Sequence, residues 1–313
     1  MKMILTLLLP LLLHSTTWAQ SFIGTFVAIK GDVKILRNPT NGGENGPLAI
    51  YEGVKYSYEI AKIGKKIRPQ EIVQSGADGK AKITYPNGDQ FVIGVGTTMV
   101  MPSITDKSED QKSSSIQLLY GRLRALISKS GPRNNMKVKT PTAVAGVRGT
   151  DFFTRANPSV GTQLTVIRGE VAVNSIAKPE EVVQVKTGFS VEAKSKTEAP
   201  PQLIETTKED LMNLQSESTV KVTKEQLAEL SPEVKKTVNA LSEKTKDAML
   251  NDIKTENAAL YNELKMKQNL DTEEINTAVV AKLYVKAPSA KKKQPSQEEI
   301  DAIGRDVYEK YFK

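Results

Sequence analysis

Short runs of alternating apolar and polar residues fill the first two thirds of the chain. Between Phe22 and about Lys196, Gly, Asn and Asp separate these runs roughly every eight to twelve residues. Nineteen of the twenty glycines lie between Gly24 and Gly188, which is the distribution expected of many tight turns between strands. The pattern predicts a mainly β N-terminal domain of short stacked strands, similar to a solenoid or a sandwich.

One hairpin can be predicted residue by residue. Ile83 and Tyr85 precede Asn87-Gly88, and Phe91 and Ile93 follow it at alternating positions. Asn-Gly favours a two-residue hairpin turn because both turn positions need a positive φ angle. We therefore expect these two strands to pair through a two-residue turn.

The last third of the chain has helical signals instead. Thr223, Asp271 and Ser296 each precede an acid or amide by three positions, and Ser231-Pro232 places a proline at a favoured first helical position. We expect an α-helical C-terminal region after a proline-containing linker. The predicted organisation is a signal segment over 1–19, a β domain over 20–198, a linker over 199–222 and a helical region over 223–313.

A long apolar stripe follows Pro232. Its members predict one helix of about 35 residues, longer than the average of about 11, and they are Val234, Val238, Leu241, Ala248, Met249, Ile253, Leu260 and Leu264. Such a stripe needs a partner surface. Three partners remain open: the rest of this chain, another protein, or a second copy in a coiled coil through residues 223–270, although Thr237 and Thr245 weaken the heptad seam.

The N-terminus resembles a secretory signal peptide. Lys2 precedes an apolar run from Met3 to Leu13, and Thr17-Trp18-Ala19 supplies the small residues of a cleavage site. This run is shorter than the roughly 20 apolar residues that span a membrane, and no later segment approaches that length. We therefore expect cleavage after Ala19, a periplasmic or secreted location, and no integral membrane segment.

Cleavage would leave a chain without Cys, His or Trp. The sequence has no Cys, and its one His and one Trp are His14 and Trp18. Nucleophilic sites that depend on His or Cys are thereby excluded, as are imidazole and thiolate zinc sites. The acids of the β domain are scattered, and those near Asp106 lack the Gly and terminal Glu of a calcium loop. We expect no enzymatic activity, no cofactor and no metal site.

The basic excess lies on the β domain. Residues 20–200 carry 25 Lys and Arg against 16 Asp and Glu, a net charge of +9, whereas residues 201–313 carry 18 against 20, a net charge of −2. Few aromatic residues accompany these basic residues, which disfavours a nucleic-acid partner. The charge favours an envelope protein or an anionic glycan as partner, unless it serves solubility alone.

One motif is more specific than the rest. The segment from Thr140 to Phe153 reads TPTAVAGVRGTDFF, with IQLLYGRLRALI before it and TVIRGEVAV and VVQVKTGFSV after it. The order and spacing of these segments resemble the FecR domain family over roughly Phe26 to Val191. The resemblance implies a β-rich extracytoplasmic domain without enzymatic activity. Members that relay signals to a sigma factor have a cytoplasmic segment and a membrane helix, whereas this chain resembles an exported, free-standing variant.

The motif supplies the candidate site residues. Arg148, Thr150 and Asp151 are the candidate binding residues, and the residues expected to shape the turns and the core are Thr140, Pro141, Val147, Gly149, Phe152, Gly169 and Gly188. The favoured interpretation places Gly149 in a tight turn, which Arg148 fixes through backbone carbonyls or the Asp151 carboxylate. The other interpretation makes Arg148 an anion contact in a groove.

Together these features predict a non-catalytic binding or sensing protein of the cell envelope. An exposed sheet edge would allow a partner protein to add a strand. One alternative is a protein that binds envelope glycan or lipopolysaccharide through its basic surface and tyrosines, such as Tyr51, Tyr56, Tyr58 and Tyr85. The other is a scaffold that oligomerises through its long helix.

Overall fold

The computed structural model describes residues 22–39, 47–104, 113–129, 135–194, 202–268 and 270–285. Within these ranges the chain forms eighteen strands followed by five helices. The predicted order of a mainly β part and a helical C-terminal part is therefore confirmed. The expected signal peptide and the helix start at Ser296 lie outside the described residues.

The strands form one hydrogen-bonded network that is folded into two layers. Sheet A contains, in order of pairing, β5 (Lys66–Ile67), β1 (Gly24–Lys30), β7 (Lys80–Thr84), β8 (Gln90–Ile93), β10 (Ser113–Leu126), β13 (Asp151–Asn157), β14 (Gly161–Arg168), β17 (Phe189–Ala193) and β18 (Gln202–Glu205). Sheet B contains β3 (Leu48–Tyr51), β4 (Val54–Ile60), β2 (Val33–Pro39), β6 (Ile72–Ser75), β9 (Thr98–Ile104), β10 again, β11 (Asn135–Lys139), β12 (Ala143–Val147), β15 (Glu170–Ser175) and β16 (Val182–Lys186).

Strand β10 joins the two sheets. Its first half pairs with β9 and β11 in sheet B, and its second half, from Gly121, pairs with β8 and β13 in sheet A. Gly121 has a φ angle of 102°, and a Cβ atom at this position would lie 2.4 Å from the Cα atom of Thr97. Glycine tolerates both this conformation and this close approach, so the strand can pass from one sheet to the other.

The core lies between the two sheets. Buried side chains from both sheets form one cluster, in which Ile83 and Phe91 of sheet A accompany Ile35 and Val73 of sheet B. The apolar residues that alternate with polar ones along each strand therefore lie on the face that lines this core, as the sequence predicts.

The predicted hairpin around Asn87 forms, but its two-residue turn is wrong. Strands β7 and β8 pair from Thr84 and Gln90 outward, so the connection between them is longer than two residues. Gly88 has a φ angle of 92°, whereas Asn87 does not have a positive φ. The Asn87 side chain instead donates a hydrogen bond of 2.6 Å to the Asp89 carboxylate, and this local contact shapes a wider loop.

The helices are α1 (Lys208–Glu217), α2 (Lys224–Glu229), α3 (Pro232–Glu256), α4 (Ala258–Lys265) and α5 (Thr272–Val285). The side chains of Thr223 and Ser231 cap α2 and α3 as predicted. The expected helix of about 35 residues is wrong, because α3 ends at Glu256. Asn257 has a φ angle of −150°, and its side chain accepts a hydrogen bond of 3.0 Å from the backbone N–H of Leu260, which starts α4.

The expected linker over 199–222 contains regular structure. Residues Gln202–Glu205 form β18, which pairs with β17 at the edge of sheet A, and α1 follows directly. Thr207 and Asp210 form a capping box at the start of α1. The described part of this segment therefore extends the sheet and leads into the first helix.

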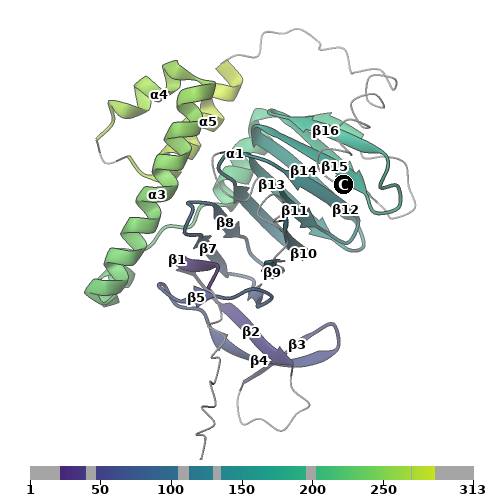
Figure 1. The fold of residues 1–313 in the computed structure, drawn as a ribbon, viewed down its shortest axis with the longest axis vertical. Coiled ribbons are helices and arrows are strands. Elements are labelled where there is room, and N and C mark those ends of the chain that lie inside the picture. Colours follow the sequence, from purple (N-terminus) through teal and green to yellow (C-terminus); the bar gives the residue numbers. More distant parts are fainter. Residues whose placement is uncertain are drawn as a thin grey trace, which may run out of the picture.

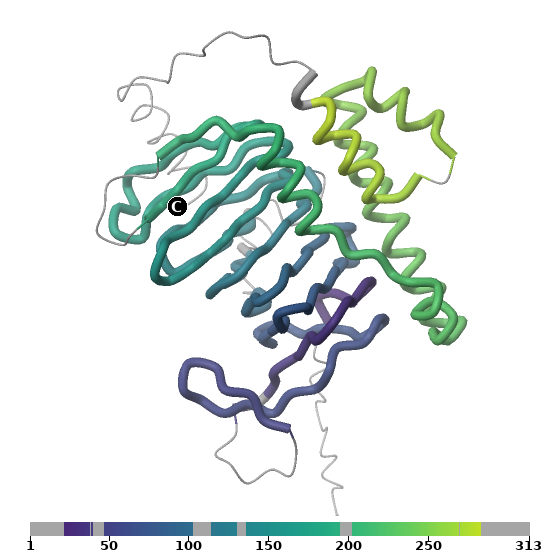
Figure 2. Tube along the Cα trace, turned by 180° about the vertical axis from the view of Figure 1, so that it is seen from behind, coloured from purple at the N-terminus to yellow at the C-terminus, as the bar shows by residue number. Residues whose placement is uncertain are grey.

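The helices pack on sheet A. Figure 1 shows α3, α4 and α5 together on one side of the sheets, and Figure 2 shows the same arrangement from behind. A second apolar cluster joins Leu126, Phe153 and Ile167 of the sheet to residues of α1, α3, α4 and α5. The sequence left three possible partners for the apolar stripe. In the described residues, the stripe packs against the rest of this chain. No helix in the described ranges is long and apolar enough to cross a membrane.

Candidate binding site

The three candidate binding residues of the motif do not converge on one site. Arg148 is exposed, whereas Thr150 and Asp151 are buried. The suggested contact between Arg148 and Asp151 is wrong, because both carboxylate oxygens of Asp151 accept hydrogen bonds from Arg124, at 2.8 and 2.6 Å. The sequence does not reveal this pair, since the two residues lie on neighbouring strands whose register only the fold sets.

The other motif residues lie in the turns and the core. Gly149 has a φ angle of 64°, and a Cβ atom there would lie 2.9 Å from the Cα atom of Lys129. Thr140 holds the turn before β12, since its hydroxyl donates to the carbonyl of Ala143 at 3.0 Å and accepts from the N–H of Ala143 at 2.9 Å. Val147 and Phe152 are buried in the main core, Pro141 is half-buried beside the Thr140 turn, and Gly169 and Gly188 have φ angles of 84° and 86°.

Arg124 joins two strands to two helices. Its side chain is 1% exposed, and besides Asp151 it donates to Gln215 of α1 at 2.6 Å and to Asn276 of α5 at 2.9 Å. Its guanidinium carbon lies 4.8 Å from the centre of the Phe153 ring. A buried guanidinium needs such a full set of acceptors, so this contact fixes the helices in place on sheet A.

The β part of the sequence has an excess of cations and the helical part an excess of acids, and the two meet in ion pairs where the helices pack on sheet A. Lys82 of β7 pairs with Glu273 of α5 at 2.5 Å, and Arg168 of β14 pairs with Asp252 of α3 at 3.1 Å. In each pair the strand supplies the cation and the helix supplies the carboxylate. Burial raises the pKa of Asp252, Arg168 lowers it and Glu256 raises it again. The positive β part and the negative helical part of the sequence are therefore partly explained by their contact.

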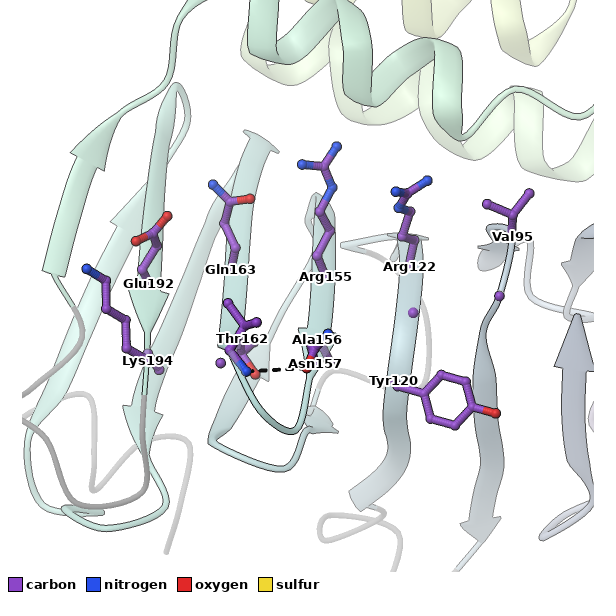
Figure 3. A pocket seen from close by; sticks show the side chains of 15 residues that line it. Val95, Tyr120, Arg122, Arg155, Ala156, Asn157, Thr162, Gln163, Glu192 and Lys194 are labelled. Carbon is purple, nitrogen blue, oxygen red and sulfur yellow. Dashed lines mark hydrogen bonds between the residues drawn. The ribbon is translucent and has the colours of Figure 1, made fainter. Parts of the chain in front are cut away.

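An open groove lies on sheet A where the helices do not cover it. It has a volume of about 520 Å³. Its lining includes Tyr120, Arg122, Arg155, Gln163 and Glu192. Figure 3 shows Arg122, Arg155, Gln163 and Glu192 side by side on neighbouring strands, with their side chains on the same side. This follows from the register, in which Arg122 pairs with Arg155, Arg155 with Gln163, and Gln163 with Glu192.

Four cations at one level of sheet A form what we call the basic row: Lys30, Lys80, Arg122 and Arg155. Lys30 pairs directly with Lys80, and Arg122 pairs directly with Arg155. Like charges opposite one another on paired strands lower the stability of a sheet. Lys30 and Lys80 form no ion pair with the residues that the structure describes.

The last residue of α1, Glu217, provides a carboxylate at the basic row. Its Oε2 atom lies 2.8 Å from Nη2 of Arg155 and 3.6 Å from Nε of Arg122. Burial lowers the pKa of Lys80, Lys30 lowers it further, Glu217 raises it and Arg122 lowers it again. The basic row therefore has more positive charge than this carboxylate balances, and an anion could bind beside it.

The sequence alone predicts on which face of the sheet Arg122 and Arg124 lie. In GRLRAL, Arg122 and Arg124 alternate with Leu123 and Ala125, so that both arginines must lie on the face opposite the core. The sequence does not show that β10 pairs with β13, and hence does not bring Arg155 beside Arg122. No group of His, Cys, Asp or Glu that could hold a metal ion occurs among the described residues.

Residues 71–172 match the family described as FecR protein. We call this stretch, which matches the FecR family, the FecR segment. It runs from Glu71, before β6, to Ala172 in β15, which is shorter than the range of roughly Phe26 to Val191 that the motifs indicate. The FecR segment contains the Arg124–Asp151 pair and Lys80, Arg122 and Arg155 of the basic row. Lys30, Glu217 and all the helices lie outside it.

Two crystal structures, each described as that of a candidate anti-sigma factor from Parabacteroides distasonis ATCC 8503, also match the chain. Each has 18% sequence identity and a TM-score of 0.36, and the match covers 43% of this chain and 59% of that chain. The chain thus spans less than two thirds of the length of these proteins. No curated protein matches it.

Proposed function

We propose that this chain is a non-catalytic, signal-related binding protein, and that its basic row holds an acidic segment of a partner protein. The FecR match over residues 71–172 supports a regulatory role. The observation that carries the binding site is the basic row itself, in which two pairs of like charges lie directly opposite one another. An anionic ligand would relieve this repulsion, whereas the free protein bears it.

The position of Glu217 supports an anionic ligand. A carboxylate at the C-terminal end of a helix faces the negative end of the helix dipole, which is unfavourable. Glu217 occupies that place on α1 and contacts Arg122 and Arg155. An acidic side chain of a partner would bind in the same way, because the same two guanidinium groups can donate hydrogen bonds to further carboxylate oxygens.

The groove favours a peptide over a glycan. Apolar side chains, including Val95 and Val160, line it together with the arginines. Neighbouring strands lie about 4.8 Å apart, so Arg122 and Arg155 present a compact pair of cations beside an apolar surface. An extended peptide with alternating acidic and apolar side chains matches both features.

An envelope location belongs to the same proposal. The apolar run from Met3 to Leu13 and the small residues before Gln20 support export. The basic surface would then meet acidic segments of envelope proteins. Immunoblotting of cell fractions with and without an inhibitor of signal peptidase would test this part separately.

The binding site is tested by titrating the full chain into a fluorescently labelled peptide of alternating Glu and Val and measuring anisotropy. We expect micromolar binding that weakens at least about tenfold between roughly 0.05 and 0.3 M salt, because exposed charges are screened. Replacement of both Arg122 and Arg155 by Gln should weaken binding by about tenfold or more.

The matched control replaces Lys139 and Lys186 by Gln, which removes the same charge from exposed positions of sheet B. This variant should bind as the unmodified chain does. Equal affinity of the two variants, or no binding of the peptide at all, would contradict the proposal. A parallel titration with an anionic polysaccharide that binds more tightly than the peptide at the same arginines would favour the glycan alternative instead.

A further inference from the structure

The hairpin of β3 and β4 projects from one end of the sheets, below the remaining strands in Figure 1. Its two-residue turn consists of Glu52 and Gly53, with φ angles of 49° and 78°. Strand β3 pairs with β4, from Leu48 opposite Ser57 to Tyr51 opposite Val54. The hairpin lies in sheet B, away from the groove and the helices.

One face of this hairpin is wholly apolar and aromatic. The register places Ala49 opposite Tyr56 and Tyr51 opposite Val54, and alternation adds the remaining members. We call this set the hairpin face: Ala49, Tyr51, Val54, Tyr56, Tyr58 and Ile60. Val54 is 43% exposed and Ile60 is 50% exposed, and none of the set belongs to an apolar cluster of the described residues.

The tyrosines of the hairpin face form a local surface. The rings of Tyr51 and Tyr56 meet edge to face at 5.8 Å, and the ammonium group of Lys34 lies 4.9 Å from the centre of the Tyr58 ring. Burial and the neighbouring Glu52 raise the pKa of Tyr51 to about 12. Tyr85, in contrast, is fully buried in the core and cannot take part in binding at the surface.

The edge of this hairpin also differs from the other sheet edges. Within the described residues, four strands pair on one side only: β3, β5, β16 and β18. Strands β5, β16 and β18 carry Lys66, Lys186 and Glu205, and charges of this kind oppose unwanted strand pairing. Strand β3 carries no charged residue, and its Ile50 is 67% exposed.

We propose that β3 pairs with β3 of a second copy of this chain, so that sheet B continues across a twofold dimer. A twofold axis through Ile50 places Ile50 opposite Ile50 and Ala49 opposite Tyr51 of the second copy, so that residues of the same face lie opposite one another. Every pair is uncharged, so the same segment from two copies meets no repulsion, which is the self-complementarity that a twofold interface requires. The two hairpin faces then become continuous on one side of the joined sheet.

The sequence of the hairpin favours a second copy over a charged partner. Glu52, Lys55 and Glu59 lie outside the pairing strand, and β3 itself offers neither a cation nor an anion to select an oppositely charged peptide. The basic row lies in sheet A, so a dimer through β3 leaves the groove open in both copies. The inference therefore stands independently of the proposed partner.

Sedimentation velocity of the full chain over about 2 to 200 µM tests this proposal. A contact through one short strand and a small face is weak, so we expect a monomer that becomes a dimer with a dissociation constant on the order of 10–100 µM. Ile50→Lys places a charge on the edge and should leave a monomer at all these concentrations. Mixing Ile50→Lys with Ile50→Glu should restore the dimer.

Ile176→Lys is the matched control, because Ile176 is 43% exposed but lies in the connection between β15 and β16, away from both β3 and the groove. It should dimerise as the unmodified chain does, and circular dichroism should show equal folding of all the variants. A chain that stays monomeric up to 200 µM would overturn the proposal, and so would an Ile50→Lys variant that dimerises like the control. Neither result would alter peptide binding at the basic row.

Discussion

Replacing Arg124 by Met is expected to lower the free energy of unfolding by about 3–5 kcal/mol. The substitution leaves the Asp151 carboxylate, which is 2% exposed, without the guanidinium that donates to both its oxygens. It also removes the hydrogen bonds that connect β10 to Gln215 and Asn276. Urea unfolding followed by circular dichroism would measure the loss.

Two further variants show whether the loss comes from the unpaired charge. Arg124→Met combined with Asp151→Leu should cost less than Arg124→Met alone, because the double variant leaves no buried carboxylate behind. Arg122→Met, two residues earlier on the same strand, should change the free energy of unfolding by less than about 1 kcal/mol, since exposed ion pairs contribute little. If Arg124→Met costs no more than Arg122→Met, the structural role given to Arg124 is wrong.

Replacing Gly149 by Ala is expected to lower the free energy of unfolding by about 2–5 kcal/mol. A φ angle of 64° costs an alanine about 1–2 kcal/mol relative to glycine. The new Cβ atom would also lie 2.9 Å from the Cα atom of Lys129, so the backbone must move, and such overpacking adds about 1–3 kcal/mol. Thermal and urea unfolding would both report the change.

Gly188→Ala is the control for this prediction. Gly188 has a φ angle of 86°, but no atom lies within 4 Å of the position that its Cβ atom would take. The substitution should therefore cost only the conformational part, about 1–2 kcal/mol. Equal losses for the two variants would show that the close approach to Lys129 does not contribute.

Much of the β part could be predicted because its information is local. Alternation identifies the strands, and the glycine in the Arg148-Gly149-Thr150 motif identifies a turn with a positive φ angle. The same local rules identify the caps at Thr223 and Ser231. They fail where one side chain changes the outcome, as at Asn257, whose amide caps a new helix within a continuous apolar stripe.

The groove lined by Arg122 and Arg155 could not be predicted because it depends on contacts between distant segments. Arg122 and Arg155 lie opposite one another only because β10 pairs with β13, and that register is set by the whole sheet. The contact of Glu217 with both arginines needs, in addition, the docking of α1 on sheet A. The motif residues were the candidates that the sequence offered. In the structure Asp151 is buried and binds Arg124, whereas the basic row is spread over β1, β7, β10 and β13.

The central claim is that the sign of the charge in the groove selects the partner. Reversing Arg122 and Arg155 to Glu together with Glu217→Lys keeps opposite charges in contact within the protein but inverts the charge of this part of the groove. Anisotropy titrations would compare two peptides that differ only in carrying Glu or Lys. The unmodified chain should prefer the Glu peptide by at least about tenfold, and the reversed variant should lose or invert that preference. An unchanged preference in the reversed variant, at equal thermal stability, would contradict the account.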